Sequence, residues 1–255
     1  MIKIRQFPCL SDNYGYLVRD NETGAVAAVD TPDADAINAA LARENLRLTH
    51  ILNTHWHPDH TGGNQSLKDR WDCRIIGPRG EAAKIPGIDE TVGEGDVVAL
   101  GKSRAIVLDT PGHTAGHIIY HFVEDAALFV GDTIFALGCG KLFEGTQEEM
   151  WASLSKIAAL PPITKLFCAH EYTMSNARFA LTVDPENPDL ARRTLEISAK
   201  RARGEPTVPS TLADELATNP FLRATDAAIQ TAVGMSDAAP ADVFGELRRR
   251  KDRFR

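Results

Sequence analysis

Short β-branched and aromatic runs alternate with amphipathic stretches over the first two-thirds of this 255-residue chain. Most of these runs are bounded by Gly, Pro, Asn or Asp, as strands commonly are. The strand candidates are IKIRQF, YGYLVRD, AVAAVD, LTHILNTH, CRIIGP, DVVAL, RAIVLDT, HIIYHF, AALFVGD and TKLFCAH. The helix candidates between them are DADAINAALARENL, GGNQSLKDRW and TQEEMWASLSKIAAL. Such an order predicts an α/β sandwich, with mostly antiparallel sheets between helical layers.

The strand pattern stops near residue 172, and helical patterns follow it. Asn187 is typical of an N-cap and Pro188 of the first helical position, while Gly204 closes the helix PDLARRTLEISAKRA. The segments TDAAIQTAVG and PADVFGELRRRKDRF predict two more helices. We therefore expect an α/β domain at residues 1–172 and a small all-α domain at residues 173–255.

The composition is that of a soluble globular protein, with 43% hydrophobic and 25% charged residues. A net charge of −7 argues against nonspecific binding of nucleic acid. The start of the chain lacks a signal-peptide pattern, and no run approaches the roughly 18 apolar residues of a membrane span. The four cysteines are far apart and form no CxxC pair, which suits a reducing compartment. We expect a cytoplasmic protein, with a monomer as the default.

The segment THWHPDH, which directly follows an apolar strand, contains four potential metal ligands within six residues. They are His55, His57, Asp59 and His60. Nitrogen and carboxylate donors suit Zn²⁺, or Mn²⁺ and iron at a more oxygen-rich position. A purely structural role is a poor explanation, because three histidines so close together repel one another strongly once they are protonated.

Four residues cannot complete two metal sites, so the remaining ligands must come from other strand ends. His113 in DTPGHTAGH, Asp132 in LFVGDT and His170 in LFCAHEYT each stand where an apolar strand gives way to a loop. A single His or Asp at a strand end is usually not a ligand. Together with the first cluster, however, these three make seven ligands, which is what two metals need.

Three other histidines are not predicted to bind metal. His50 precedes a strand and His121 lies inside one, so both are expected to be packed or solvated. His117 is ambiguous, because it could form a hydrogen bond with a ligand without binding metal itself.

The pattern HxHxDH, followed by separate His, Asp and His residues, resembles the metallo-β-lactamase superfamily. Over nearly the whole chain the resemblance is to the hydroxyacylglutathione hydrolases, or glyoxalase II enzymes. Its marks are SDNYGYLV, THWHPDHTGGN, TPGHTAGH, FVGDTIFALGCGKLFEGT, CAHEYT and RRRKDRF. The superfamily motif is specific for fold and metal, whereas GCGKLFEG and HEYT indicate this family. The resemblance implies an αββα sandwich with a small all-α C-terminal domain.

The resemblance also implies a division of the ligands between two divalent metal ions, with zinc expected and iron or manganese as alternatives. One ion would be held by His55, His57 and His113, the other by Asp59, His60 and His170, with Asp132 bridging. The spacing is consistent with this division, because alternate residues of an extended segment point the same way. The catalytic candidates are Asp59 and Asp132, both as ligands. Asp59 could also receive a proton, but metal binding makes it poorly available for that.

The implied reaction is hydrolysis of S-(2-hydroxyacyl)glutathione, typically S-D-lactoylglutathione, to glutathione and D-lactate, the second step of methylglyoxal detoxification. Two metals about 3.5–4 Å apart lower the pKa of a shared water from about 15.7 toward about 7. The hydroxide attacks the acyl carbon while a metal stabilises the oxyanion. A thiolate leaves without a strong general acid, because the pKa of a thiol is about 8.5.

Glutathione is anionic, so an acidic protein needs local cations to bind it. The resemblance implies that the last helix folds over the active site, where Arg248 and Lys251 meet the glycine carboxylate. These two residues are three apart and share a helix face. Lys141 is another candidate cation, and Tyr172 is expected to hydrogen-bond the tripeptide. Phe143 stands where the family often has a second tyrosine. The alternative is that the basic run RRRKDRFR, at residues 248–255, is only a solvated helix end.

Three other functions compete with this interpretation. The first is another hydrolase of the same fold that acts on a lactone, a β-lactam or a phosphodiester, which the tripeptide-binding segments disfavour. The second is a relative that oxidises persulfides with a single iron, which the full second set of ligands and the helical C-terminus disfavour. The third is a metal-stabilised scaffold without activity. A structural zinc site would be closed and often contain Cys, unlike this set of His and Asp.

Overall fold

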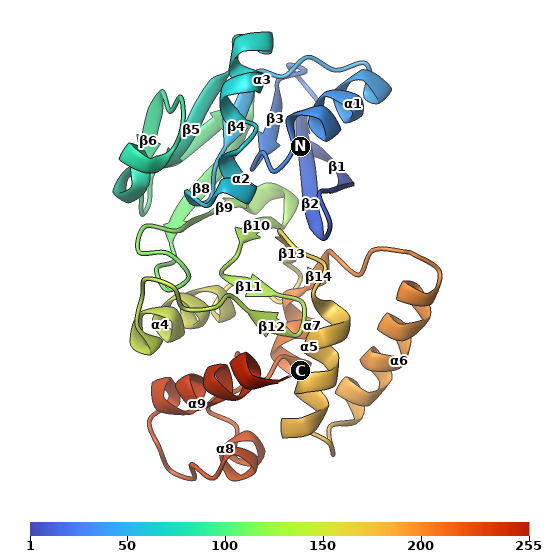
Figure 1. Ribbon diagram of the computed structural model, residues 1–255, viewed down its shortest axis with the longest axis vertical. Helices are drawn as coiled ribbons and strands as arrows, with labels where there is room; N and C mark the ends of the chain where they lie inside the picture. The colour runs from blue at the N-terminus through green and yellow to red at the C-terminus, as the bar shows by residue number, and fades with distance from the viewer. Residues whose placement is uncertain (255) are drawn as a thin grey trace. The chain divides into compact units, whose positions relative to one another are not determined.

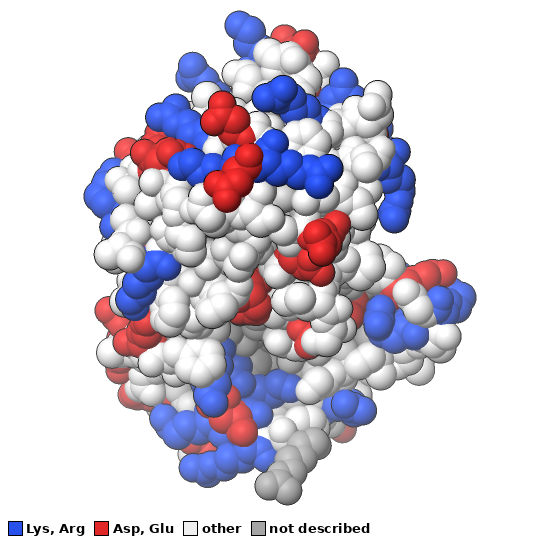
Figure 2. Space-filling model, turned by 45° about the horizontal axis from the view of Figure 1, so that its top comes forward, with Lys and Arg blue, Asp and Glu red and all other residues white. Residues whose placement is uncertain are grey.

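The computed structural model describes residues 1–254, which form two compact units (Figure 1). Unit 1 comprises Met1–Asp109 and Ala115–Gly131. Unit 2 comprises Thr110–Thr114 and the chain from Asp132 onward. None of the helices within residues 1–254 has the length and apolar character that a membrane crossing needs. The chain has a net charge of −7, but its acidic side chains are not gathered in one patch on the face drawn in Figure 2. Acidic and basic side chains are interspersed there.

The first sheet of unit 1 has the strand order β1-β2-β3-β4-β5-β6. Its strands are β1 (Ile2–Cys9), β2 (Asn13–Asp20), β3 (Val26–Val29), β4 (His50–Leu52), β5 (Arg74–Pro78) and β6 (Glu90–Val92). The first three strands pair antiparallel, but β3 to β6 pair in parallel. The expectation of mostly antiparallel sheets is wrong for this sheet, which is mixed. Parallel strands need crossover connections, and the helices between β3, β4 and β5 provide them.

Three helices and one short 3₁₀ turn accompany this sheet, namely α1 (Ala34–Glu44), α2 (Pro58–Thr61), α3 (Asn64–Trp71) and η1 (Arg79–Lys84). α1 begins where the carboxylate of Asp33 accepts hydrogen bonds from the backbone of its first turn. α1 and α3 pack on one side of the sheet (Figure 1), where Ile37, Leu41 and Leu67 join a core with Leu17 and other strand residues. Burying one such side chain contributes about 1.5–3 kcal/mol.

The other strands of unit 1 form an antiparallel meander of β7 (Val97–Leu100), β8 (Ser103–Asp109), β9 (Ile118–Phe122) and β10 (Ala127–Gly131). The 3₁₀ turn η2 (Val123–Asp125) joins the last two. The meander packs against the first sheet. The hydroxyl of Tyr120 donates to the carbonyl of Asn53 at 2.9 Å, and the ring of Phe129 meets that of Tyr16 edge-on at 5.5 Å. The two sets of strands therefore share a core, as the predicted sandwich requires.

Up to residue 254, the described part of unit 2 contains two short antiparallel pairs and six helices. The pairs are β11 (Ile134–Phe135) with β12 (Gly138–Cys139), and β13 (Lys165–Cys168) with β14 (Ser210–Thr211). The helices are α4 (Gln147–Ala158), α5 (Thr173–Val183), α6 (Pro188–Ala202), α7 (Leu212–Thr218), α8 (Ala227–Val233) and α9 (Pro240–Arg253). In its interior, the ring of Phe221 stacks on that of Phe179 at 5.8 Å and meets that of Phe244 edge-on at 6.0 Å.

The helices predicted in this region are present, and α6 begins at Asn187 and Pro188 as expected. Two helices, α5 and α7, were not predicted. The expectation that strands stop near residue 172 is wrong, because β14 (Ser210–Thr211) lies well beyond that point and pairs with β13. Arg255, the last residue of the helical domain expected at residues 173–255, lies outside the described residues.

Candidate metal centre

Unit 1 brings four predicted ligands together just after β4. His55 and His57 lie in the loop that follows the strand, and Asp59 and His60 lie in α2. Nε2 of His55 and Nδ1 of His57 are 3.0 Å apart, so both nitrogens can face one cation. Nε2 of His60 lies 3.5 Å from Oδ2 of Asp59, which forms a second pair of donor atoms. The rings of His55 and His60 are buried, and their centroids are 4.0 Å apart.

Asp30, just after β3, orients two of these rings. Its Oδ2 lies 2.8 Å from Nδ1 of His60, and its two oxygens accept hydrogen bonds from the backbone N–H and the hydroxyl of Thr54. The same hydroxyl lies 3.0 Å from Nδ1 of His55. A ring whose Nδ1 is engaged in this way keeps Nε2 available for a metal. Sequence analysis missed Asp30, although its place at the end of an apolar strand was a usable signal.

Unit 2 brings the other three predicted ligands together. His113 follows β8, Asp132 follows β10 and His170 follows β13, and all three are buried. Oδ2 of Asp132 lies 3.3 Å from Nε2 of His113, and Oδ1 lies 3.5 Å from Nε2 of His170. Nδ1 of His113 donates to the carbonyl of Lys141 at 2.8 Å, which again leaves Nε2 for a metal. Asp132 thus presents a different oxygen to each histidine, as a bridging carboxylate would.

All seven predicted ligands belong to groups of His and Asp side chains that could hold a metal ion. Imidazole and carboxylate donors fit zinc, iron or manganese.

The three other histidines differ in position. His117 is buried, and its ring stacks on that of His55 at 4.7 Å. His121 lies inside β9, where burial lowers its pKa, and His50 begins β4.

The predicted substrate contacts all lie in unit 2, and two of them are aromatic. The ring of Tyr172 stacks flat on that of His170 at 4.8 Å. The ring of Phe143 meets that of His113 edge-on at 5.3 Å, and the ammonium of Lys141 lies 5.4 Å from the Phe143 ring. Tyr172 is 38% exposed and Phe143 is 60% exposed. Each aromatic residue therefore combines contact with a predicted ligand and access to solvent.

The other two predicted contacts lie on α9. Arg248 is only 8% exposed, and its guanidinium donates to the carbonyl of Cys139 at 2.9 Å and to the carboxylate of Asp252. The ammonium of Lys251 donates to the carbonyl and the hydroxyl of Ser175 at 3.2 and 2.9 Å. Burial lowers the pKa of Lys251 to about 8, and the positive charge of Arg248 acts in the same direction.

Two family models match consecutive parts of the chain. Residues 16–170 match the metallo-beta-lactamase superfamily. Residues 171–254 match the hydroxyacylglutathione hydrolase C-terminus. The hydroxyacylglutathione hydrolase of Hyphomonas neptunium is 55% identical over 254 residues, covering 100% of this chain and 99% of that protein. That of Methylococcus capsulatus is 51% identical over 255 residues and covers 100% of both.

Solved structures agree with this assignment at the level of the fold. ETHE1 from Myxococcus xanthus is 23% identical with a TM-score of 0.67, covering 99% of this chain and 100% of that one. TTHA1623, solved in a di-iron-bound form, is 26% identical with a TM-score of 0.58, covering 66% of this chain and 91% of that one. The chain has the metallo-β-lactamase fold, and it belongs to the hydroxyacylglutathione hydrolase, or glyoxalase II, family.

Proposed function

We propose that this enzyme hydrolyses the thioester of S-(2-hydroxyacyl)glutathione, typically S-D-lactoylglutathione, to glutathione and the 2-hydroxy acid. The observation that carries this proposal is identity above 50% with hydroxyacylglutathione hydrolases over the full chain. That identity includes the helical region, which matches the C-terminal model of the same family and contains Arg248 and Lys251. In the cell, the reaction would complete methylglyoxal detoxification.

We propose that the chain holds two divalent cations, zinc or alternatively iron or manganese. His55, His57 and His113 would hold one, and Asp59, His60 and His170 the other, with Asp132 between them. The within-unit pairs support this division, because His55 faces His57, His60 faces Asp59, and the two oxygens of Asp132 face different histidines. The di-iron form of TTHA1623 is a precedent in a related protein. When bound, such cations supply a nucleophile from water near neutral pH and a Lewis acid for the acyl oxygen.

The protein's own residues would orient the ligands and the substrate. Asp30 and the Lys141 carbonyl fix three ligand rings, directly or through Thr54. Lys141, Tyr172, Arg248 and Lys251 would hold the anionic tripeptide, and Phe143 would add an apolar contact beside it. A thiolate leaves unaided because the pKa of a thiol is about 8.5, so the proposed site requires no separate acid. Asp59 and Asp132 would act as ligands only.

Three further assignments remain proposals. We place the boundary between the catalytic domain and the helical domain at residues 172 and 173, because the two family models meet between residues 170 and 171. All four cysteines lie within the described residues and are buried free thiols, which supports a cytoplasmic location. A monomer is the expected state, to be checked by light scattering.

The function is tested by elemental analysis together with hydrolysis of S-D-lactoylglutathione. We expect close to two metal ions per chain and loss of hydrolysis on chelation. A fully active enzyme with one tightly held ion would falsify the dinuclear assignment. Hydrolysis of lactones without hydrolysis of glutathione thioesters would contradict the proposed substrate.

A further inference from the structure

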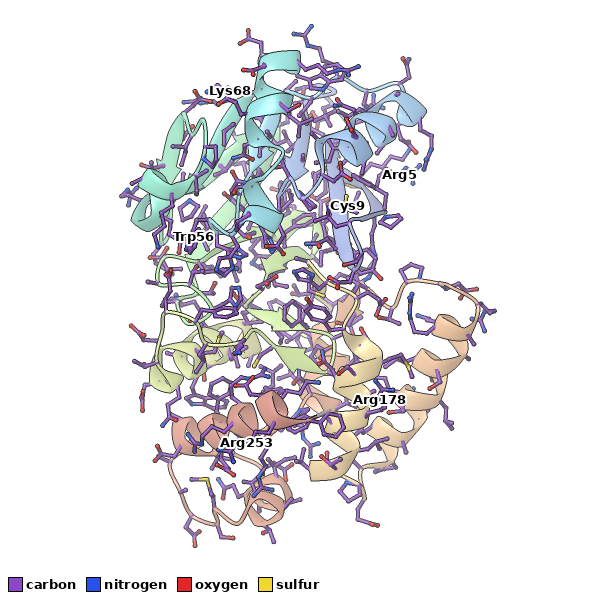
Figure 3. All side chains as sticks on the ribbon, in the orientation of Figure 1. Arg5, Cys9, Trp56, Lys68, Arg178 and Arg253 are labelled. Atoms are coloured by element: carbon purple, nitrogen blue, oxygen red, sulfur yellow. The ribbon has the colours of Figure 1, made fainter. Side chains whose placement is uncertain are left out.

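A buried carboxylate connects two loops of unit 1, one that carries the predicted ligands His55 and His57 and one that carries His117. Glu81 lies in η1 and is 3% exposed. Its Oε2 accepts a hydrogen bond from the backbone N–H of Trp56 at 2.9 Å, and its Oε1 accepts one from the backbone N–H of Gly116 at 2.9 Å. Trp56, labelled in Figure 3, stands between His55 and His57 in the chain.

The first loop is held at alternate residues by two carboxylates. The backbone N–H of Thr54 donates to Asp30 at 2.8 Å, and that of Trp56 donates to Glu81. The ring of Trp56 is also held by η1, since the ammonium of Lys84 lies 4.4 Å from its centroid. Because the peptides on both sides of His55 are fixed, the direction of its side chain is fixed as well.

The second loop approaches Glu81 closely. A Cβ atom on Gly116 would lie 2.7 Å from Cγ of Glu81, so glycine is needed for this approach. The next residue is His117, whose ring stacks on that of His55 at 4.7 Å with an interplanar angle of 26°. One carboxylate therefore fixes the backbone beside both members of a stacked pair, one of which is a predicted ligand.

We infer that Glu81 is a positioning residue that sets the directions of His55 and His57 toward their metal ion. This inference rests on the metal centre proposed above. A carboxylate suits the role because both of its oxygens accept, whereas a glutamine would place a donor NH₂ opposite one of the two N–H groups. Partners that orient metal ligands commonly change metal affinity by about 10–100-fold.

The test compares the full-length enzyme with its Glu81→Gln and Glu81→Asp variants. Zinc affinity is measured by competition with a chromophoric chelator, and Tm is measured with and without zinc. We expect Glu81→Gln to bind zinc about 10–100-fold more weakly and to show a smaller rise in Tm on adding zinc. Its kcat should fall, while KM for S-D-lactoylglutathione should change little.

A matched control is Asp20→Asn in the same unit. Asp20 is a buried carboxylate that accepts hydrogen bonds from the backbone of Thr23 and Ser103, and neither residue adjoins a predicted ligand in the chain. This variant should lower the Tm of the metal-free protein and leave zinc affinity unchanged.

Parental zinc affinity in Glu81→Gln, with a lowered Tm, overturns the inference, because Glu81 would then be only structural. Equal losses of affinity in Glu81→Gln and Asp20→Asn also overturn it. If Glu81→Gln does not fold, the zinc affinity of Glu81→Asp decides between the two roles. The aspartate keeps the charge, but it is one carbon too short to reach the N–H groups of both Trp56 and Gly116. A parent enzyme that binds no zinc, iron or manganese overturns the proposed metal centre itself, and this inference with it.

Discussion

The ammonium group of Lys251 titrates in a range where the enzyme can be assayed, which makes its proposed contact with a substrate carboxylate testable by pH. Burial lowers its pKa from 10.5 to about 8. The charged and titratable groups that face it are Arg248 and Asp252 of α9, Arg178 of α5 (labelled in Figure 3) and the thiol of Cys139. The two arginines contribute to this lowering after burial, and the other two groups oppose it.

The direction of the pH effect follows from this lowered pKa. About 90% of Lys251 is charged at pH 7 and about 10% at pH 9 if its pKa is about 8. Only the charged form attracts a carboxylate, so kcat/KM for S-D-lactoylglutathione should fall about tenfold over this range. The quantity kcat/KM is the appropriate one because its pH dependence reports the pKa values of the free enzyme. Lys251→Arg stays charged and should remove the dependence. Lys251→Ala should lower kcat/KM at pH 7 by about tenfold to a hundredfold, because a charge-assisted hydrogen bond contributes about 1.5–3 kcal/mol.

The assay needs an internal reference, because groups at the metal centre also respond to pH. A small neutral thioester without the glycine carboxylate provides it, and the measured quantity is the ratio of the two kcat/KM values. Titration at the metal centre affects both substrates and cancels in this ratio. A ratio that stays constant from pH 7 to pH 9 in the parent would refute the reasoning. So would a Lys251→Arg variant that retains the parental slope.

Other predictions address the metal centre, stability and affinity. Asp132→Ala should strip metal from both sites by elemental analysis, whereas His121→Ala should retain it, and the reverse pattern would show the ligand set to be wrong. Both variants need a check of folding by circular dichroism, since lost ligands also cost stability. Arg193 pairs with the fully buried Glu215, so Arg193→Met should destabilise the protein by about 3–5 kcal/mol in urea unfolding, and a loss below about 1 kcal/mol would contradict this. Phe143→Tyr should lower KM by about 2–10-fold, because a hydrogen bond contributes about 0.5–1.5 kcal/mol. The Tm should change little, because the side chain of Phe143 is 60% exposed. An unchanged KM would speak against a contact between residue 143 and the tripeptide.

Elements with strong local signals were predictable from the sequence. Asp33 and Asn187 cap the helices that follow them, as their residue types suggest. Two kinds of feature escaped prediction. In the described part of the chain, no side-chain hydrogen bond caps α5 at Tyr172, so its start gave no capping signal. The parallel pairing of β3 to β6 also escaped, because alternation of apolar residues marks a strand but does not give its direction.

Within the metal centre, predictability depended on whether a residue lies in a recognisable sequence motif. Four ligands fall within six residues of one loop, which makes them visible in the sequence. The carboxylates that hold this loop, Asp30 and Glu81, lie about 25 residues before and after it. Each is a single acidic residue outside any motif, and only the pairing of β3 with β4 and the position of η1 bring them to the loop. Ligand type is thus a local property of the chain, whereas ligand orientation is a tertiary one.

Arg248 shows how a predicted binding residue can also belong to the fold. Its guanidinium donates to the carbonyl of Cys139, two residues before Lys141, and to Asp252. Arg248→Ala would therefore remove a proposed contact with the substrate and also loosen the loop that presents Lys141. A loss of affinity in that variant alone cannot separate these two effects. Ionic strength can separate them, because salt weakens a direct attraction to the glycine carboxylate but hardly affects a buried bond to a backbone carbonyl. If the defect of Arg248→Ala is equally large at low and high salt, and equal for a neutral thioester, Arg248 acts through the loop and Lys251 is left as the cation on α9 that contacts the substrate.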